Sequence, residues 1–180
     1  MKGILRELVL NNTQISLSGE AIFKATGKHV IIYDDLKKFN SLDELLNIDD
    51  FQTILYVSNM GQGSISGHYC FIYRNERGVH FFDSYGLNVD DEIQFGKYEE
   101  KYLSKLLEDS GLQVFHNNIR YQELADQNPR HTAVCGAYCI MRHYTMNTMS
   151  DKTFHKLLTE NKTEFVPDVL VCLLATLAYQ

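Results

Sequence analysis

Short apolar runs in the middle of the chain predict strands. They cover residues 51–57 (FQTILYV), 68–73 (HYCFIY) and 79–82 (VHFF). Residues 74–78 (RNERG) separate the last two runs and have the polar and glycine chemistry of a hairpin turn. We therefore expect an antiparallel hairpin in which residue 68, at the start of one strand, lies beside residue 83, at the end of the next.

Helical patterns surround this strand cluster. Residues 98–109 place Leu103, Leu106 and Leu107 on one face, and Gly111 is a stop signal. Further helices are expected over 18–27 with Ser18 as cap, from Ser41, from Cys135, from Ser150, and over 166–179 with Pro167 in its first turn. Short strands are expected at 29–33, 112–115 and 118–121. This order predicts an α+β fold with a central mixed or antiparallel sheet flanked by helices.

Length and charge limit the possible functions. The 180 residues include only 2 prolines and suit a single domain over residues 1–180. A net charge of −6 without a basic run argues against strong nucleic-acid binding. The apolar C-terminal stretch is too short to span a bilayer, and the N-terminus has no signal-peptide pattern, so an intracellular protein is expected. The acidic pairs at 34–35, 49–50, 90–91 and 99–100 are expected to be solvated faces or loop ends and not paired catalytic carboxylates.

The four cysteines are expected to be reduced thiols. Cys135 and Cys139 have no second Cys or His pair at zinc spacing, so neither a metal site nor a cofactor is expected. Cys70, Cys139 and Cys172 fit apolar positions in the core. Cys135 differs because it stands where a helix should begin, a place that favours the thiolate.

A catalytic set can be assembled around Cys135. A thiol nucleophile needs a base that also returns a proton to the leaving amine, and His68 suits that role. Asp83, across the expected hairpin, would fix the tautomer of the imidazole and stabilise its cation. Taken singly, the cysteine could be a buried structural thiol, the histidine a strand residue and the aspartate a turn residue. Their combination is what points to catalysis.

Three segments carry a family resemblance: GHY at 67–69, FDSYG at 82–86 and CGAYC at 135–139. Their order and spacing resemble those of the adenovirus-proteinase and SUMO-protease superfamily of cysteine peptidases, over roughly residues 50–145. The resemblance implies an adenain-like fold and a Cys135-His68-Asp83 triad. The short chain favours a small viral maturation protease of virophage or adenovirus type, which would cleave capsid or other virion precursor proteins.

The chain departs from the family pattern at two places. Tyr69 stands where the family has tryptophan. The oxyanion glutamine usually lies six or seven residues before the cysteine, whereas Gln127 lies eight, Asn128 seven and Gln122 thirteen residues before Cys135. Gln127 is the first choice and Asn128 the second.

The resemblance also implies a location and a partner, and it leaves alternative functions open. Host cytoplasm or a viral factory is the expected location, with packaging into the virion also possible, and an activating peptide would be a partner. The main alternative is a protease that removes ubiquitin or a ubiquitin-like protein of SUMO type. An inactive interaction module and an acyltransferase are less favoured, because all three triad residues are present and no basic patch for coenzyme A is evident.

Overall fold

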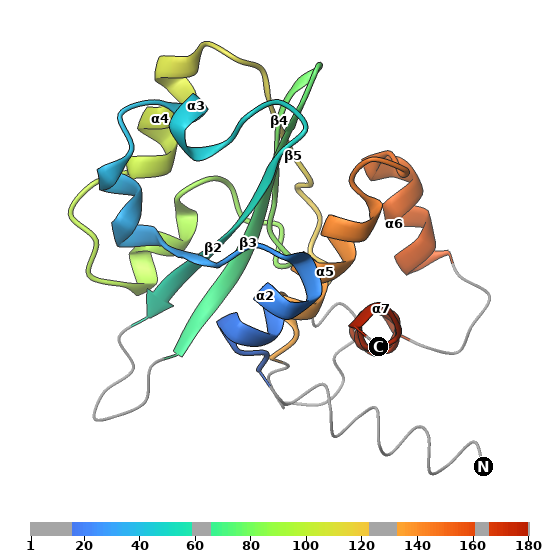
Figure 1. Cartoon of the computed structure of the whole chain (residues 1–180). Coiled ribbons are helices and arrows are strands. Elements are labelled where there is room, and N and C mark those ends of the chain that lie inside the picture. Colours follow the sequence, from blue (N-terminus) through green and yellow to red (C-terminus); the bar gives the residue numbers. More distant parts are fainter. Residues whose placement is uncertain (1–15, 59–65, 123–132, 161–165, 180) are drawn as a thin grey trace, which may run out of the picture.

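A mixed sheet forms the middle layer of the molecule (Figure 1). The computed structural model describes residues 16–58, 66–122, 133–160 and 166–179, and within these ranges five strands pair in the order β1-β2-β3-β4-β5. β2, β3 and β4 are antiparallel, and β1 and β5 add parallel at the two edges. The strands are β1 (Ile31–Ile32), β2 (Phe51–Ser58), β3 (Ser66–Asn75), β4 (Gly78–Phe82) and β5 (Val114–His116).

Helices cover both faces of the sheet, which confirms the predicted α+β class (Figure 1). On one face lie η1 (Tyr33–Lys38), α3 (Leu42–Leu45) and α4 (Tyr102–Ser110). On the other lie α2 (Gly19–Thr26), α5 (Cys135–Thr145), α6 (Asp151–Thr159) and α7 (Pro167–Tyr179). The 3₁₀ helix η2 (Asp91–Phe95) follows β4.

The alternation of side chains along β3 divides the core into two parts. Tyr69, Phe71 and Tyr73 belong to the cluster beneath α5, whereas Cys70 and Ile72 belong to the cluster beneath α4. Because both faces are covered, this central strand has a continuous apolar sequence instead of alternating with polar residues.

The sequence signals for helix ends are confirmed. The hydroxyls of Ser18, Ser41 and Ser150 each accept a hydrogen bond from the backbone N–H three residues later. Gly27 and Gly111 end α2 and α4 with φ angles of 74° and 64°, in the left-handed region that glycine adopts without steric cost.

Some predicted boundaries are wrong. The helix expected from residue 98 begins at Tyr102, and the Tyr98 side chain lies against the end of β2, where its hydroxyl donates to the carbonyl of Val57 at 3.0 Å. The strand expected at 29–33 is only Ile31–Ile32, since Tyr33 already starts η1.

The segment 118–121 is not a strand. Its backbone turns toward the loop after β4, where the N–H groups of Tyr121 and Gln122 donate to the carbonyl of Ser84 at 2.8 and 2.9 Å. Asn118 has a φ of 45°, which interrupts the extended backbone that a strand needs.

Asp90 lies at a loop end just before η2, but its carboxylate is not solvated. It is 2% exposed and accepts hydrogen bonds from the Tyr33 hydroxyl at 2.7 Å and the Ser104 N–H at 2.8 Å. These bonds satisfy the buried carboxylate and tie η1 and α4 to the start of η2.

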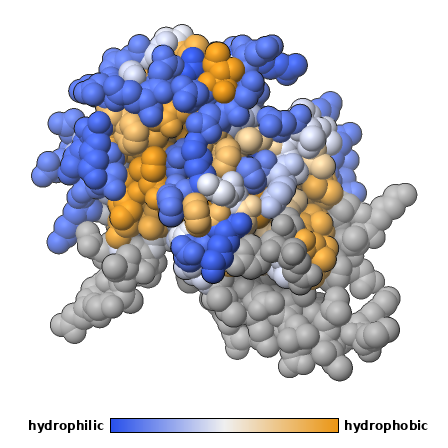
Figure 2. Space-filling view, viewed as in Figure 1, coloured by the Kyte–Doolittle hydropathy of each residue, from blue (hydrophilic) through white to orange (hydrophobic). Residues whose placement is uncertain are grey.

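The visible surface is largely hydrophilic, with apolar areas between the polar residues (Figure 2). Within the described ranges, every helix is too short or too polar to cross a lipid bilayer.

Candidate active site

The β3–β4 hairpin brings His68 and Asp83 together. In this hairpin Phe71 pairs with Phe82, and continuing the register by one residue puts Asp83 opposite Cys70. His68 lies two residues before Cys70 and therefore on the same side of β3. The expected pairing of His68 with Asp83 is thus diagonal, and the directly opposite position belongs to Cys70.

The two side chains are in hydrogen-bonding contact. His68 Nε2 lies 3.0 Å from Asp83 Oδ2, and both residues are buried, at 8% and 0% exposure. The other carboxylate oxygen, Oδ1, accepts from the Tyr85 N–H at 2.6 Å. Asn117 holds the backbone of Asp83 from both sides, since its amide accepts from the Asp83 N–H at 3.0 Å and donates to the Asp83 carbonyl at 2.7 Å.

The electrostatics favour an ion pair between these residues. Burial alone would lower the pKa of His68, but the contacts with Asp83 and Cys135 outweigh burial and raise this pKa well above 6.5. Burial alone would raise the pKa of Asp83, but its bonds with His68, Cys70 and the Tyr85 N–H bring this pKa below 3.8. An imidazolium beside a carboxylate is therefore stabilised at neutral pH.

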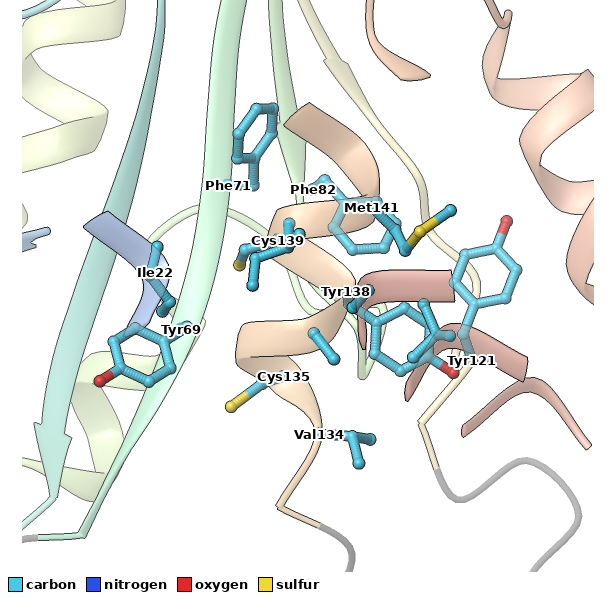
Figure 3. Packing of buried hydrophobic residues seen from close by; sticks show 14 of the residues in the cluster. Ile22, Tyr69, Phe71, Phe82, Tyr121, Val134, Cys135, Tyr138, Cys139 and Met141 are labelled. Atoms are coloured by element: carbon cyan, nitrogen blue, oxygen red, sulfur yellow. The ribbon is translucent and has the colours of Figure 1, made fainter. Parts of the chain in front are cut away.

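Cys135 is the first residue of α5, as the sequence predicted, and its side chain leaves the helix on the side of Tyr69 (Figure 3). A side-chain hydrogen bond to Cys135 is among the causes that raise the pKa of His68. The structure thus joins His68 and Asp83 directly, and Cys135 is near enough to influence the pKa of His68.

Gly136 permits the close packing that holds the start of α5 in place. A Cβ atom here would lie 3.2 Å from the Cβ of Leu17 and 3.5 Å from Cδ2 of Tyr69. Tyr69 itself is 7% exposed and therefore packs largely inside the core.

The site contains residues that the sequence analysis did not assign to it. The thiol of Cys70 donates to Asp83 Oδ2 at 3.1 Å, and Glu92 Oε1 lies 3.9 Å from His68 Nε2. The Tyr85 ring lies over His68 with 5.1 Å between ring centroids. Cys70 could have been predicted to lie near His68, because residues two apart on a strand point to the same face. Glu92 belongs to η2, and no local sequence pattern predicts its proximity to His68.

The candidates for the oxyanion amide are only partly described. Gln127 and Asn128 lie outside the described residues. Gln122 is 1% exposed, and its Oε1 accepts from the Ser84 hydroxyl at 2.8 Å, so this amide braces the loop after Asp83.

The same cluster offers ligand atoms for a metal ion. Three residues, His68, Cys70 and Asp83, each offer one ligand atom, and these three atoms lie within 4.8 Å of one another. All three residues are buried. Nitrogen, sulfur and oxygen together suit zinc.

Comparison with known proteins gives a distant relative. No protein-family model matches the chain. The uncharacterized protein V9 of Sputnik virophage is 25% identical over 122 residues, which cover 63% of this chain and 65% of that protein. The chain is therefore distantly homologous to a virophage protein, and the match spans less than two thirds of the relative's length.

Proposed function

We propose that this protein is a cysteine endopeptidase with an adenain-like fold, in which Cys135 is the nucleophile, His68 the general base and Asp83 the orienting carboxylate. The observation that carries the proposal is the position of His68, which contacts Asp83 through Nε2 at 3.0 Å and whose pKa is raised in part by Cys135 at the N-terminus of α5. This is the order of contacts that a thiol triad requires.

Each residue has a defined step in the proposed reaction. The Cys135 thiol gives its proton to His68 Nδ1, and the thiolate attacks the carbonyl carbon of the scissile peptide bond. Backbone N–H groups in the first turn of α5 lack intrahelical acceptors and can donate to the oxyanion, together with the amide of Gln127 or Asn128. His68 then protonates the leaving amine, and water hydrolyses the acyl-enzyme thioester. Asp83 keeps the proton on Nε2 and stabilises the imidazolium throughout.

The proposed substrates are capsid or other virion precursor proteins cut during maturation. The likeness to a virophage protein supports a viral setting for the proposal. The resemblance of its three motif segments to the superfamily supports the same substrate class.

A cleavage assay tests this proposal. The full chain would be incubated with the structural proteins encoded by the same viral genome, and new N-termini would be identified by mass spectrometry. Cys135→Ala is the matched control, because it removes one sulfur atom at a buried position and should leave the fold intact. We expect site-specific cleavage by the wild type and none by Cys135→Ala.

Equal cleavage by both proteins would contradict the proposal. A parallel incubation with ubiquitin and SUMO carrying C-terminal electrophiles separates the alternative function. Capture of either probe at Cys135, without cleavage of virion proteins, would identify a deconjugating enzyme instead.

A further inference from the structure

Four buried side chains surround the point where β3, β4 and η2 meet. His68 and Glu92 are each 8% exposed, and Cys70 and Asp83 are 0% exposed. Asp83 Oδ2 lies 3.0 Å from His68 Nε2 and 3.1 Å from Cys70 Sγ. Glu92 Oε1 approaches the same Nε2 atom to 3.9 Å. One nitrogen, one sulfur and two carboxylate groups therefore converge from three elements of the fold.

This set has both the chemistry and the spacing of a zinc site. Zinc takes four ligands from histidine, cysteinate and carboxylate groups at about 2.0–2.3 Å, so neighbouring ligand atoms in a tetrahedron lie about 3.3–3.8 Å apart. Three of the separations, at 3.0, 3.1 and 3.9 Å, are within a few tenths of an ångström of this range, and the ligand atoms of His68, Cys70 and Asp83 all lie within 4.8 Å of one another. Small side-chain shifts would open the cluster around an ion.

We propose that His68, Cys70, Asp83 and Glu92 bind a zinc ion that reversibly inhibits the enzyme. Binding requires the Cys70 thiol to release its proton to solvent, and His68 to bind the ion through Nε2 with its proton on Nδ1. A protonated Nδ1 can no longer accept the proton of Cys135. The inhibitory role, unlike the binding itself, rests on the proposed peptidase function.

Two arrangements within the site support this assignment over capture of the ion by the nucleophile. Asp83 Oδ2 is shared by His68 and Cys70, so these residues already present their ligand atoms to a common centre. Cys135 belongs to α5, whereas His68 and Cys70 lie two residues apart on β3 and share a contact with Asp83. His68 and Glu92, at 8% exposure each, are the least buried of the four residues.

Cobalt titration tests binding without relying on activity. Tetrahedral Co²⁺ has the same ligand preferences as zinc and gives a thiolate charge-transfer band together with intense visible bands. In full-length Cys135→Ala protein we expect one equivalent of Co²⁺ to produce the charge-transfer band and the visible bands. Added zinc should displace the cobalt and abolish these bands. Cys70→Ser should abolish the charge-transfer band, and Glu92→Gln should weaken affinity about 10–100-fold or more, as removal of a metal-site group does. Cys139→Ala, which removes another buried thiol, should behave as its parent.

Two results would overturn the binding site. The first is the absence of saturable cobalt binding. The second is a charge-transfer band that persists in Cys70→Ser and disappears in Cys135→Ala, because that pattern assigns the sulfur ligand to the nucleophile.

Alkylation of wild-type Cys135 tests the inhibitory role separately. One equivalent of zinc should slow iodoacetamide labelling of Cys135, a chelator should restore it, and Cys70→Ser should be insensitive to zinc. Cobalt binding with unchanged alkylation would refute inhibition while retaining the site. A wild-type Cys135 no more reactive than a simple thiol would instead contradict the peptidase function.

Discussion

The carboxylate of Asp83 is fixed by more groups than a triad requires. Its two oxygens accept from His68, from the Cys70 thiol and from the Tyr85 N–H, while Asn117 clamps its backbone. A buried carboxylate stays ionised only if such donors replace water. In the proposed triad, Cys70 would therefore be a positioning residue that acts only through Asp83.

We expect Cys70→Ala to slow alkylation of Cys135 by roughly tenfold near neutral pH, which corresponds to loss of one hydrogen bond to a charged group. The acid limb of the pH profile should move to higher pH, because a less stabilised Asp83 charge supports the imidazolium less well. Cys70→Ser, which restores a donor, should recover part of the rate. Cys139→Ala is the matched control, and an equal effect of both alanine variants would assign Cys70 to packing alone.

Glu92 gives a prediction for stability. Burial is the main cause that raises the pKa of Glu92 above 4.5, so the folded protein holds this proton more tightly than the unfolded chain. The stability that this proton contributes is complete below pH 4.5 and is lost as the pH rises through the raised folded value. Glu92→Gln should thus have a larger free energy of unfolding than the wild type at about pH 7, and the two should converge in acid.

Urea unfolding of both proteins at neutral pH and below pH 4.5 measures this difference. Greater stability of the wild type at neutral pH would show that the charge of Glu92 is instead needed by the fold, through its ion pair with His68.

At the scale of elements, α5 is fixed by the buried Arg142. Its guanidinium lies over the rings of Tyr73, Phe82 and Phe154, and Nη2 lies 2.6 Å from Oδ1 of Asp151 in α6. Among the described residues, its Nε and Nη1 have no hydrogen-bond partner. The side chain therefore contributes mainly by filling space between α5, α6 and the sheet.

We expect Arg142→Ala to lower the free energy of unfolding by about 3 kcal/mol, because it opens a cavity among three aromatic rings. Arg142→Met should cost less than about 1 kcal/mol, since it retains most of the volume and leaves the Asp151 side chain, 45% exposed, in contact with water. Chemical denaturation of the two variants and the wild type gives both values. Equal losses would assign the stabilisation to the charge of Arg142 and not to its volume.

Sequence patterns located the elements better than their ends. Serine caps and terminal glycines fixed the starts or stops of α2, α4 and α6, because these signals act through hydrogen bonds only three or four residues long. The early start predicted for α4 failed because Tyr98 bonds to β2, a contact 41 residues distant in the chain. Local patterns carry no information about such a partner.

For the whole molecule, topology determines which parts of the site were predictable. His68 and Asp83 are joined by one hairpin, so strand alternation and a short turn suffice to predict their proximity. The position of Cys135 depends on the packing of α5 against β3. Local patterns do not predict this packing, and Cys135 was placed with His68 and Asp83 on the basis of the motif resemblance. Glu92 and Asn117 reach the site from η2 and the segment after β5, so only the tertiary structure reveals their roles.

The reactivity of Cys135 is the most direct measure of the proposed triad. Iodoacetamide labelling near neutral pH, followed by mass spectrometry of all four cysteines, compares the wild type with His68→Ala and Asp83→Asn. We expect rapid, selective labelling of Cys135 in the wild type, a large loss in His68→Ala, and a smaller loss in Asp83→Asn, which retains a hydrogen-bonding side chain but loses the charge. Slow, uniform labelling of all four thiols, unaffected by either substitution, would contradict the triad.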